Sequence, residues 1–202
     1  MTREQLEHAI RAACDIAEDD AVYVFGSQAI LGEHPDAPRT LRQSVEVDVT
    51  PRTRMDRVDA IDGAIGELSV FHETHGFYVH GLPIEEAAKL PKGWRDRVVG
   101  VGSPETTGGK MGLCLEGHDL AASKLAAFRE KDREFVLVLL KERLVKARTL
   151  LARIETLPLA HEERARRAEW VRLTVGGLPG KAPGRKKPRK GPPTGRGGKA
   201  ER

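Results

Sequence analysis

The N-terminal residues carry apolar side chains at helical spacing. Thr2 and Gln5 precede them with the spacing of a capping box, in which each side chain accepts a hydrogen bond from the backbone of the other residue. The pattern predicts a helix over residues 3–17. The apolar positions that define it are Leu6, Ile10, Ala13 and Ile16.

Two strands are predicted from two different patterns. Residues 21–25 form a short apolar run that ends at Gly26, which is typical of a buried strand followed by a tight turn. Residues 44–49 alternate instead, with valines on one face and Glu46 and Asp48 on the other, and Pro51 ends the run. The valines assigned to the apolar face are Val45, Val47 and Val49.

The other elements are predicted by the same criteria. Residues 55–65 read as a second helix, and residues 32–43 and 103–110 as loops, the first of which is alternatively a broken helix. Asp119 is the expected N-cap of a long helical region in which two helices meet near residues 130–132. The remaining predicted strands are residues 77–82, 97–101 and 113–115, and the remaining helices are 144–154 and 162–173.

This order of elements predicts an α/β (α+β) fold with a mixed sheet flanked by helices. We expect the sheet domain over residues 1–117, a helical segment packed on it over 118–175, and a disordered basic tail over 176–202. The tail holds nine Lys or Arg and one Glu, whereas the preceding residues hold 25 basic and 29 acidic side chains. The net charge of +4 therefore comes from the tail.

The distribution of apolar residues and cysteines argues against a secreted, membrane-spanning or zinc-binding protein. No segment has the apolar run of a signal peptide or the length of a membrane span, so we expect a cytoplasmic protein without membrane contact. Cys14 and Cys114 are in no metal-ligand spacing and are expected to be idle thiols. Trp94 and Trp170 are expected to be packing residues.

The chemistry begins with the acidic pair on the alternating strand. Glu46 and Asp48 are two residues apart, which places their side chains on one face, roughly 6.5–7 Å apart along the strand. Two such carboxylates can bind Mg²⁺ or Mn²⁺, and a bound ion would neutralise charge during transfer at a nucleotide phosphate. The alternative is an ordinary half-exposed strand with two solvated acids.

Three further features carry weaker signals. Gly26 and Ser27 follow a buried strand, where glycine permits close approach of a ligand and serine can bind a phosphate oxygen, although such a pair is often only a turn. His72, His75 and His80 cluster in sequence, but lack the remaining ligands of a zinc site. The tail is expected either to bind RNA or DNA nonspecifically or to act as a solubilising terminus.

The ordered combination resembles the nucleotidyltransferase superfamily. The chain looks closest to uncharacterised families related to the AbiEii toxins of type IV toxin–antitoxin systems, over about residues 1–150. In those toxins a helix bears a lysine, followed by Arg-x-Lys and an aspartate. The matching segments are FGSQAILGEHPDAP (25–38), SVEVDVTP (44–51), GELSVFHETHGFYVHG (66–81) and CLEGHDLAASKLAAFREKD (114–132).

The resemblance implies roles for individual residues. Gly26 and Ser27 would contact nucleotide phosphates, and Glu46 and Asp48 would hold the catalytic metal. The basic residues of the last segment would pair with phosphates, and its aspartate would orient a basic partner or act as a base. These residues are Lys124, Arg129, Lys131 and Asp132. Without the resemblance, Lys124 and Arg129 read as the solvated face of a helix, with Lys131 and Asp132 at its end.

Two positions depart from the superfamily pattern. The first metal position holds Glu46, where the superfamily usually has aspartate, and the gap from Ser27 to Glu46 is longer than usual. A third carboxylate is not evident, since no pattern selects among Asp96, Glu67 and Glu73.

Two functions are therefore expected. The first is an enzyme that moves a nucleotide from an NTP to tRNA, another RNA or a protein acceptor, as a toxin with a cognate antitoxin. The alternative is a catalytically inactive binding module of the same fold, which associates with nucleic acid through its tail.

Overall fold

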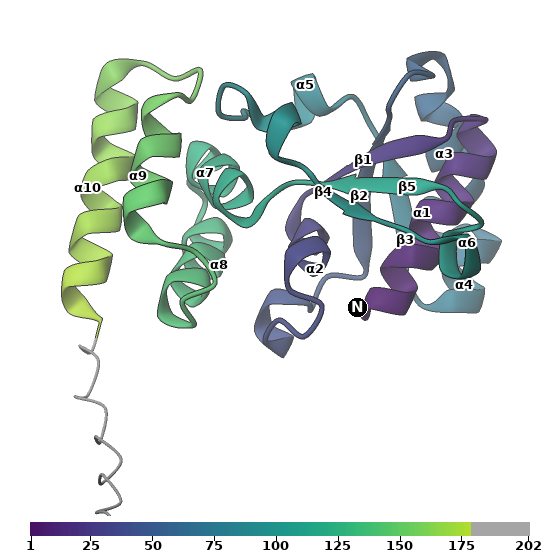
Figure 1. The fold of residues 1–202 in the computed structure, drawn as a ribbon, viewed down its shortest axis with the longest axis horizontal. Helices are drawn as coiled ribbons and strands as arrows, with labels where there is room; N and C mark the ends of the chain where they lie inside the picture. The colour runs from purple at the N-terminus through teal and green to yellow at the C-terminus, as the bar shows by residue number, and fades with distance from the viewer. Residues whose placement is uncertain (179–202) are drawn as a thin grey trace, which may run out of the picture.

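The apolar and alternating runs of the chain assemble into one five-stranded mixed sheet flanked by helices, as predicted (Figure 1). This computed structural model describes residues 1–178. The strands are β1 (Ala21–Phe25), β2 (Glu46–Pro51), β3 (Tyr78–Gly81), β4 (Val99–Val101) and β5 (Met111–Cys114), in the sheet order β3-β2-β1-β5-β4.

Helices account for most of the remaining described chain. The α-helices are α1 (Arg3–Ala17), α2 (Ile30–Glu33), α3 (Val58–Ile65), α4 (Val70–His75), α5 (Ile84–Ala87), α6 (Pro104–Thr107), α7 (Gly117–Ala127), α8 (Glu130–Lys141), α9 (Ala147–Glu155) and α10 (His161–Gly177). The 3-10 turns are η1 (Ser27–Ala29), η2 (Arg39–Leu41), η3 (Met55–Arg57) and η4 (Trp94–Arg97).

The strand directions bring the two predicted motifs together. β1 runs antiparallel to β2, so that Phe25 at the end of β1 lies opposite Asp48. β3 runs parallel to β2 and pairs His80 with Asp48. β5 is parallel to β1 and antiparallel to β4.

One face of the sheet is closed by α1 and α3. A side-chain carbon at Gly112 would meet Ile10 of α1, and one at Gly81 would meet Ile61 of α3. Their strand partners Val22 and Val49 are fully buried on this face. Because side chains alternate along a strand, Glu46 and Asp48 must lie on the opposite face. Burial of the apolar face therefore determines which way the acids point.

The helical region after residue 117 packs at one end of the sheet, where α7 and α8 face the side that carries Glu46 and Asp48. Helices α7 and α8 lie next to the sheet, and α9 and α10 form the outer layer (Figure 1). Helix α7 contacts η1 and α2, while α8 contacts η2. None of the helices in the described chain combines the length and the apolar character needed to cross a bilayer.

Several element predictions are confirmed. The helix over residues 3–17 begins at the predicted capping box, where Thr2 Oγ1 accepts from Gln5 N at 3.2 Å and Gln5 Oε1 accepts from Thr2 N at 2.8 Å. The strand over residues 21–25 is also as predicted. Trp94 is buried against Tyr23, and Trp170 packs near Phe128.

Other predictions were wrong in detail. Glu116, not Asp119, caps α7. The Glu116 carboxylate accepts hydrogen bonds from two backbone N–H groups, whereas Asp119 lies in the first turn of the helix and its side chain is buried. Val45 precedes β2 and is exposed. The loop at 103–110 contains α6, and α4 and α5 were missed because four to six residues are too few to show a helical period.

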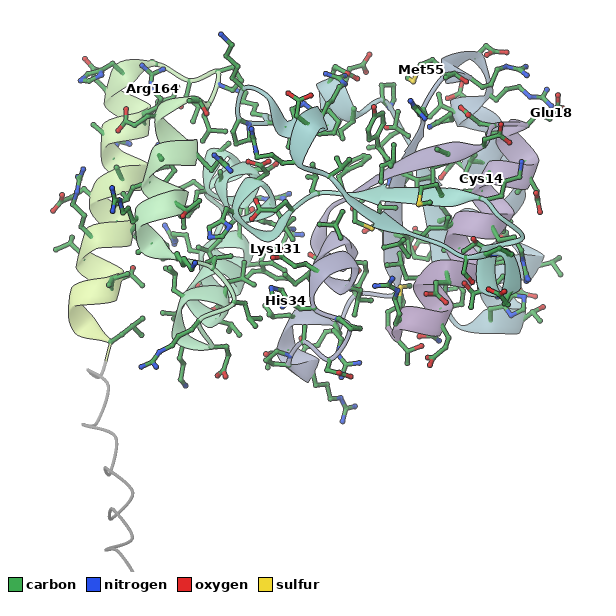
Figure 2. The ribbon with its side chains drawn as sticks, viewed as in Figure 1. Cys14, Glu18, His34, Met55, Lys131 and Arg164 are labelled. Carbon is green, nitrogen blue, oxygen red and sulfur yellow. The ribbon has the colours of Figure 1, made fainter. Side chains whose placement is uncertain are left out.

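The predicted tail lies almost wholly outside the described residues. Its expected start at residue 176 was wrong by two residues, because α10 continues through Gly177. Both cysteines are free and buried, and Figure 2 shows Cys14 beside the sheet. Burial raises the pKa of each thiol to about 12, which keeps both protonated.

Candidate functional site

The turn after β1 is built around a glycine that no other residue could replace without strain. Gly26 has φ 64° and ψ −166°. A side-chain carbon at this position would lie 1.8 Å from Asp48 Oδ2. Glycine is therefore required both by the backbone conformation and by the neighbouring carboxylate. The result is bare backbone directly beside Asp48.

The two acids project from β2 into the same space. Their side chains are partly shielded, with exposed fractions of 37 % for Glu46 and 23 % for Asp48. Ser44 Oγ accepts from the backbone N–H of Glu46 at 3.1 Å, which fixes the start of the strand. Burial, and then the neighbouring Glu46 carboxylate, raise the pKa of Asp48 from 3.8 to about 6.

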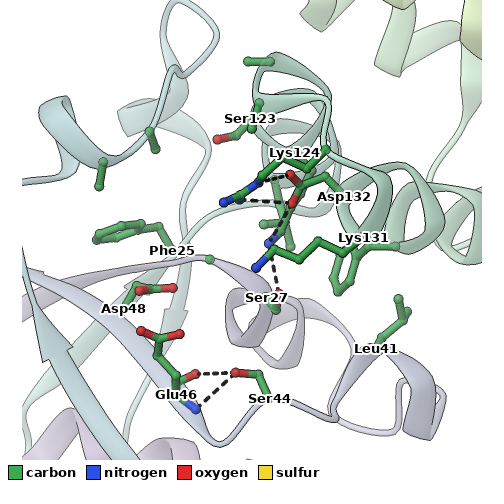
Figure 3. Close-up of a pocket in the computed structure, with 18 of the residues that line it drawn as sticks. Phe25, Ser27, Leu41, Ser44, Glu46, Asp48, Ser123, Lys124, Lys131 and Asp132 are labelled. Atoms are coloured by element: carbon green, nitrogen blue, oxygen red, sulfur yellow. Dashed lines mark hydrogen bonds and ion pairs between the residues drawn. The ribbon is translucent and has the colours of Figure 1, made fainter. Parts of the chain in front are cut away.

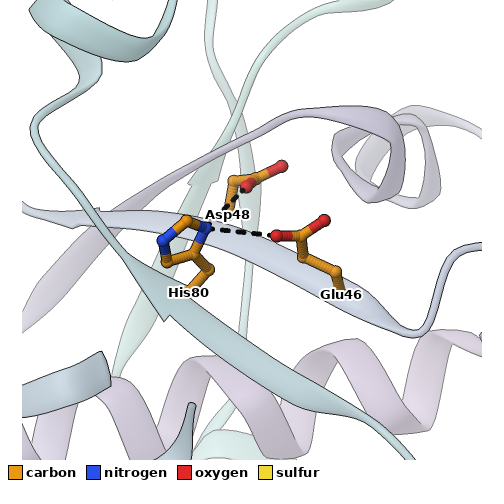
Figure 4. Close-up of side chains that lie close together, drawn as sticks. All are labelled: Glu46, Asp48 and His80. Carbon is orange, nitrogen blue, oxygen red and sulfur yellow. Dashed lines mark hydrogen bonds and ion pairs between the residues drawn. The ribbon is translucent and has the colours of Figure 1, made fainter. Parts of the chain in front are cut away.

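A histidine completes this cluster. His80 comes from β3, and its Nδ1 lies 3.1 Å from Glu46 Oε1 and 3.7 Å from Asp48 Oδ1 (Figure 4). One ligand atom of each of the three residues falls within 4.8 Å of the others. Among residues 1–178, this is the one such group of three or more potential metal ligands. The donor set of two carboxylates and an imidazole fits a divalent cation.

Basic side chains face the acids from α7 and α8. Lys124 Nζ donates to Ser27 Oγ at 3.0 Å and lies 3.6 Å from Asp132 Oδ1 (Figure 3). Arg129 Nε donates to Asp132 Oδ2 at 2.7 Å. Asp132 is almost fully buried and pairs with both cations, of which Lys124 is shielded and Arg129 is exposed at the rim of the site. Burial lowers the pKa of Lys124, against the opposing attraction of Asp132 and Asp48.

These groups line one cleft of about 970 Å³. The volume lies at the upper end of the usual range for small-molecule sites, about 300–1,000 Å³. Its walls also include apolar surface, from Leu41, Leu120, Phe135 and Val138. The cleft thus combines a basic rim, an apolar wall and a corner formed by Glu46, Asp48 and His80, which we call the acidic corner.

The structure brings together all eight residues singled out in the sequence. Each of them lines this cleft: Gly26, Ser27, Glu46, Asp48, Lys124, Arg129, Lys131 and Asp132. The interpretation of the last segment as a solvated helix face does not hold for Lys124, whose side chain is 15 % exposed, or for Asp132, at 1 %. It does describe Arg129 and Lys131, which are exposed.

The third member of the acidic corner was missed. Asp96, Glu67 and Glu73 do not join it, and His80 occupies that place. The sequence held part of the signal, since Tyr78 and His80 share one face of a predicted strand, but the register that pairs them with Glu46 and Asp48 is a property of the sheet. His72 and His75 do not join His80; their rings pack against Tyr78 and Phe71, respectively.

Comparisons with known proteins add no assignment. No protein-family model matches the chain, and no curated protein or solved structure matches it either.

Proposed function

We propose that this chain is a metal-dependent nucleotidyltransferase that moves a nucleotide from an NTP to an RNA or protein acceptor. One observation supports the proposal above all: the Gly26–Ser27 turn, the Glu46–Asp48 pair and Lys124 line a single cleft. Sequence order alone does not require this meeting, since 97 residues separate Ser27 from Lys124.

The reaction is an in-line displacement at the α-phosphorus. The oxygen of an acceptor hydroxyl forms a new bond to that phosphorus and gives up its proton to water. The bond between the α-phosphorus and the oxygen that bridges the α- and β-phosphates breaks, and pyrophosphate leaves with the electron pair. A divalent cation such as Mg²⁺ or Mn²⁺ at Glu46 and Asp48 would supply positive charge against the charge that develops on the phosphate.

The turn and the lysine are suited to hold the phosphates. Gly26 has no side chain, so a phosphate can approach the backbone beside Asp48. Because Ser27 Oγ accepts its hydrogen bond from Lys124, the serine proton is free to be donated to a phosphate oxygen. Lys124 adds a positive charge in a shielded place, where it is screened less than on the surface.

Asp132 is suited to positioning rather than to proton transfer. It is buried and paired with both Lys124 and Arg129, so its charge is already used to hold two cations. Arg129 is 61 % exposed at the rim, where it can reach an outer phosphate. The apolar surface of Leu41, Phe135 and Val138 is suited to a nucleobase.

The test is a transfer assay with two labels. Purified protein is incubated with Mg²⁺ or Mn²⁺, each NTP in turn and total tRNA, with the label on the α- or the γ-phosphate. We expect label from the α-phosphate, and none from the γ-phosphate, to appear on RNA or on protein. Asp48→Asn and Lys124→Met should each lower transfer by at least about a hundredfold, in the range seen for lost charge stabilisation.

A matched control separates chemistry from surface charge. Lys110 pairs with Asp20 at 3.0 Å and is not among the residues that line the cleft, so Lys110→Met should transfer normally. Absence of α-label transfer with every nucleotide would refute the proposal. RNA binding that is lost on deletion of residues 179–202, without any effect of nucleotides, would instead favour the inactive binding module.

The resemblance to the AbiEii toxins adds a cellular form of the same test. Induced expression of the chain in bacteria should arrest growth, and Asp48→Asn should relieve the arrest at equal protein level. Equal arrest by both proteins would separate toxicity from nucleotidyl transfer.

A further inference from the structure

The acidic corner contains three electron-pair donors that face one another. His80 Nδ1 lies 3.1 Å from Glu46 Oε1 and 3.7 Å from Asp48 Oδ1. Neighbouring ligands of an octahedral ion with bonds of about 2.1 Å lie about 3 Å apart. The imidazole nitrogen is therefore spaced from the carboxylate oxygens as a further ligand of the same ion would be.

The other ring nitrogen of His80 also faces a carboxylate. Asp62 of α3 places Oδ1 3.9 Å from Nε2, on the side of the ring away from Glu46. Metal-binding histidines usually direct their second ring nitrogen to a carboxylate or carbonyl, which selects the tautomer. At this distance Asp62 forms no direct hydrogen bond, but its negative charge favours a proton on Nε2, and a cation in the acidic corner would then take the Nδ1 lone pair. The position of Asp62 thus supports a metal-binding role for His80 independently of Glu46 and Asp48.

The donor set bears on the identity of the ion. Mg²⁺ prefers oxygen ligands only, whereas first-row transition ions also bind imidazole. The two carboxylates suit both Mg²⁺ and Mn²⁺. The imidazole nitrogen should strengthen the binding of Mn²⁺ more than the binding of Mg²⁺.

We infer that His80 is a direct metal ligand through Nδ1, oriented by Asp62, and that this site binds Mn²⁺ in preference to Mg²⁺. The inference rests on the metal site of the proposed function. It goes beyond that site by adding a ligand, a positioning residue and an ion preference.

The test uses the full chain with Mn²⁺ alone, without nucleotide. Electron paramagnetic resonance counts free Mn²⁺ from its six-line signal and yields the dissociation constant. Pulsed measurements on bound Mn²⁺ detect a directly bonded ¹⁴N nucleus. We expect ¹⁴N coupling in the native protein and its loss in His80→Asn, which offers an amide in place of the imidazole. Competition with Mg²⁺ should show that His80→Asn weakens Mn²⁺ binding about tenfold or more and Mg²⁺ binding much less.

Substitutions on α3 test the orienting role. Asp62→Asn should weaken Mn²⁺ binding by several-fold to about tenfold while ¹⁴N coupling persists. Asp59→Asn changes an exposed aspartate of the same helix and should leave binding unchanged. His161→Ala removes an exposed histidine of α10 and should leave the ¹⁴N signal intact.

The outcomes separate this inference from the proposed function. Bound Mn²⁺ without ¹⁴N coupling, or equal loss of Mg²⁺ and Mn²⁺ binding in His80→Asn, would overturn the inference even if nucleotide transfer depends on Asp48. Conversely, ¹⁴N-coupled Mn²⁺ in a protein that transfers no nucleotide would leave the inference standing and remove the proposed function.

Discussion

Replacing Asp48 with asparagine is expected to stabilise the metal-free protein at pH 7.5. In the folded chain this carboxyl group is 23 % exposed and lies beside Glu46. Burial and that neighbouring charge raise its pKa from 3.8 to about 6. At pH 7.5 the group is ionised in both the folded and the unfolded chain, but its charge is less favourable in the folded one. Asparagine removes that charge while keeping a similar shape.

The magnitude follows from the two pKa values. A difference between 3.8 and about 6, at about 1.4 kcal/mol for each tenfold change, corresponds to about 3 kcal/mol. Residual exposure makes about 2–3 kcal/mol the expected gain, or about 4–12 °C in melting temperature for a chain of this size. Because the folded chain holds the proton up to higher pH, native stability falls as pH rises from about 4 to about 6. Below pH 4 the native and Asp48→Asn proteins should be equally stable.

The assay is urea unfolding in a chelating buffer at several pH values between 4 and 8. The difference between Asp48→Asn and the native protein should grow through this range and level off above pH 6 to 7. Asp59→Asn, on the exposed side of α3, serves as control and should show no such growth. An Asp48→Asn protein that is less stable at pH 7.5, or a difference that is constant with pH, would refute the electrostatic reasoning.

Three other predictions concern neighbouring parts of the molecule. Gly26→Ala should weaken Mn²⁺ binding about tenfold or more, because the new methyl group would displace the Asp48 carboxylate; calorimetric titration would show this, and unchanged affinity would contradict it. Asp119→Ala should lower the free energy of unfolding by about 3–5 kcal/mol, because it removes the buried carboxylate that lies 2.8–2.9 Å from Arg97 and from Arg153. Urea denaturation measures this loss, and a loss under about 1 kcal/mol would show that the ion pairs are dispensable. Addition of Mn²⁺ should raise the melting temperature of the native protein more at pH 7.5 than at pH 5, since protons compete for Asp48; an equal shift at both pH values would argue against Asp48 as a ligand.

Much of the fold was predictable because its signals are local. The first helix follows from the Thr2–Gln5 capping box and from apolar residues at helical spacing. The alternation along β2 separates Glu46 and Asp48 from the buried valines before any partner strand is known. Short elements such as α5 escaped prediction, because one turn of helix shows no period.

Part of the candidate site was also visible in the sequence. Gly26, Ser27, Glu46 and Asp48 could be named as candidates because their residue types and spacing are typical of phosphate and metal binding. The interpretation of Asp119 failed for the opposite reason: an aspartate near a helix start is typical of a cap, but this one is drawn inward by two arginines from η4 and α9.

What the sequence determined by itself is the local geometry: where the first helix lies, which strand alternates, and that two acids share a face. Only the tertiary structure decided that His80 stands beside those acids, because the parallel register of β2 and β3 joins residues 32 apart. It also decided that Lys124 of α7 contacts Ser27, 97 positions earlier in the chain, and that Asp132 of α8 is buried beside Lys124. Side-chain periodicity is a property of a few neighbouring residues, whereas strand register and helix packing minimise the exposed apolar surface of the whole chain.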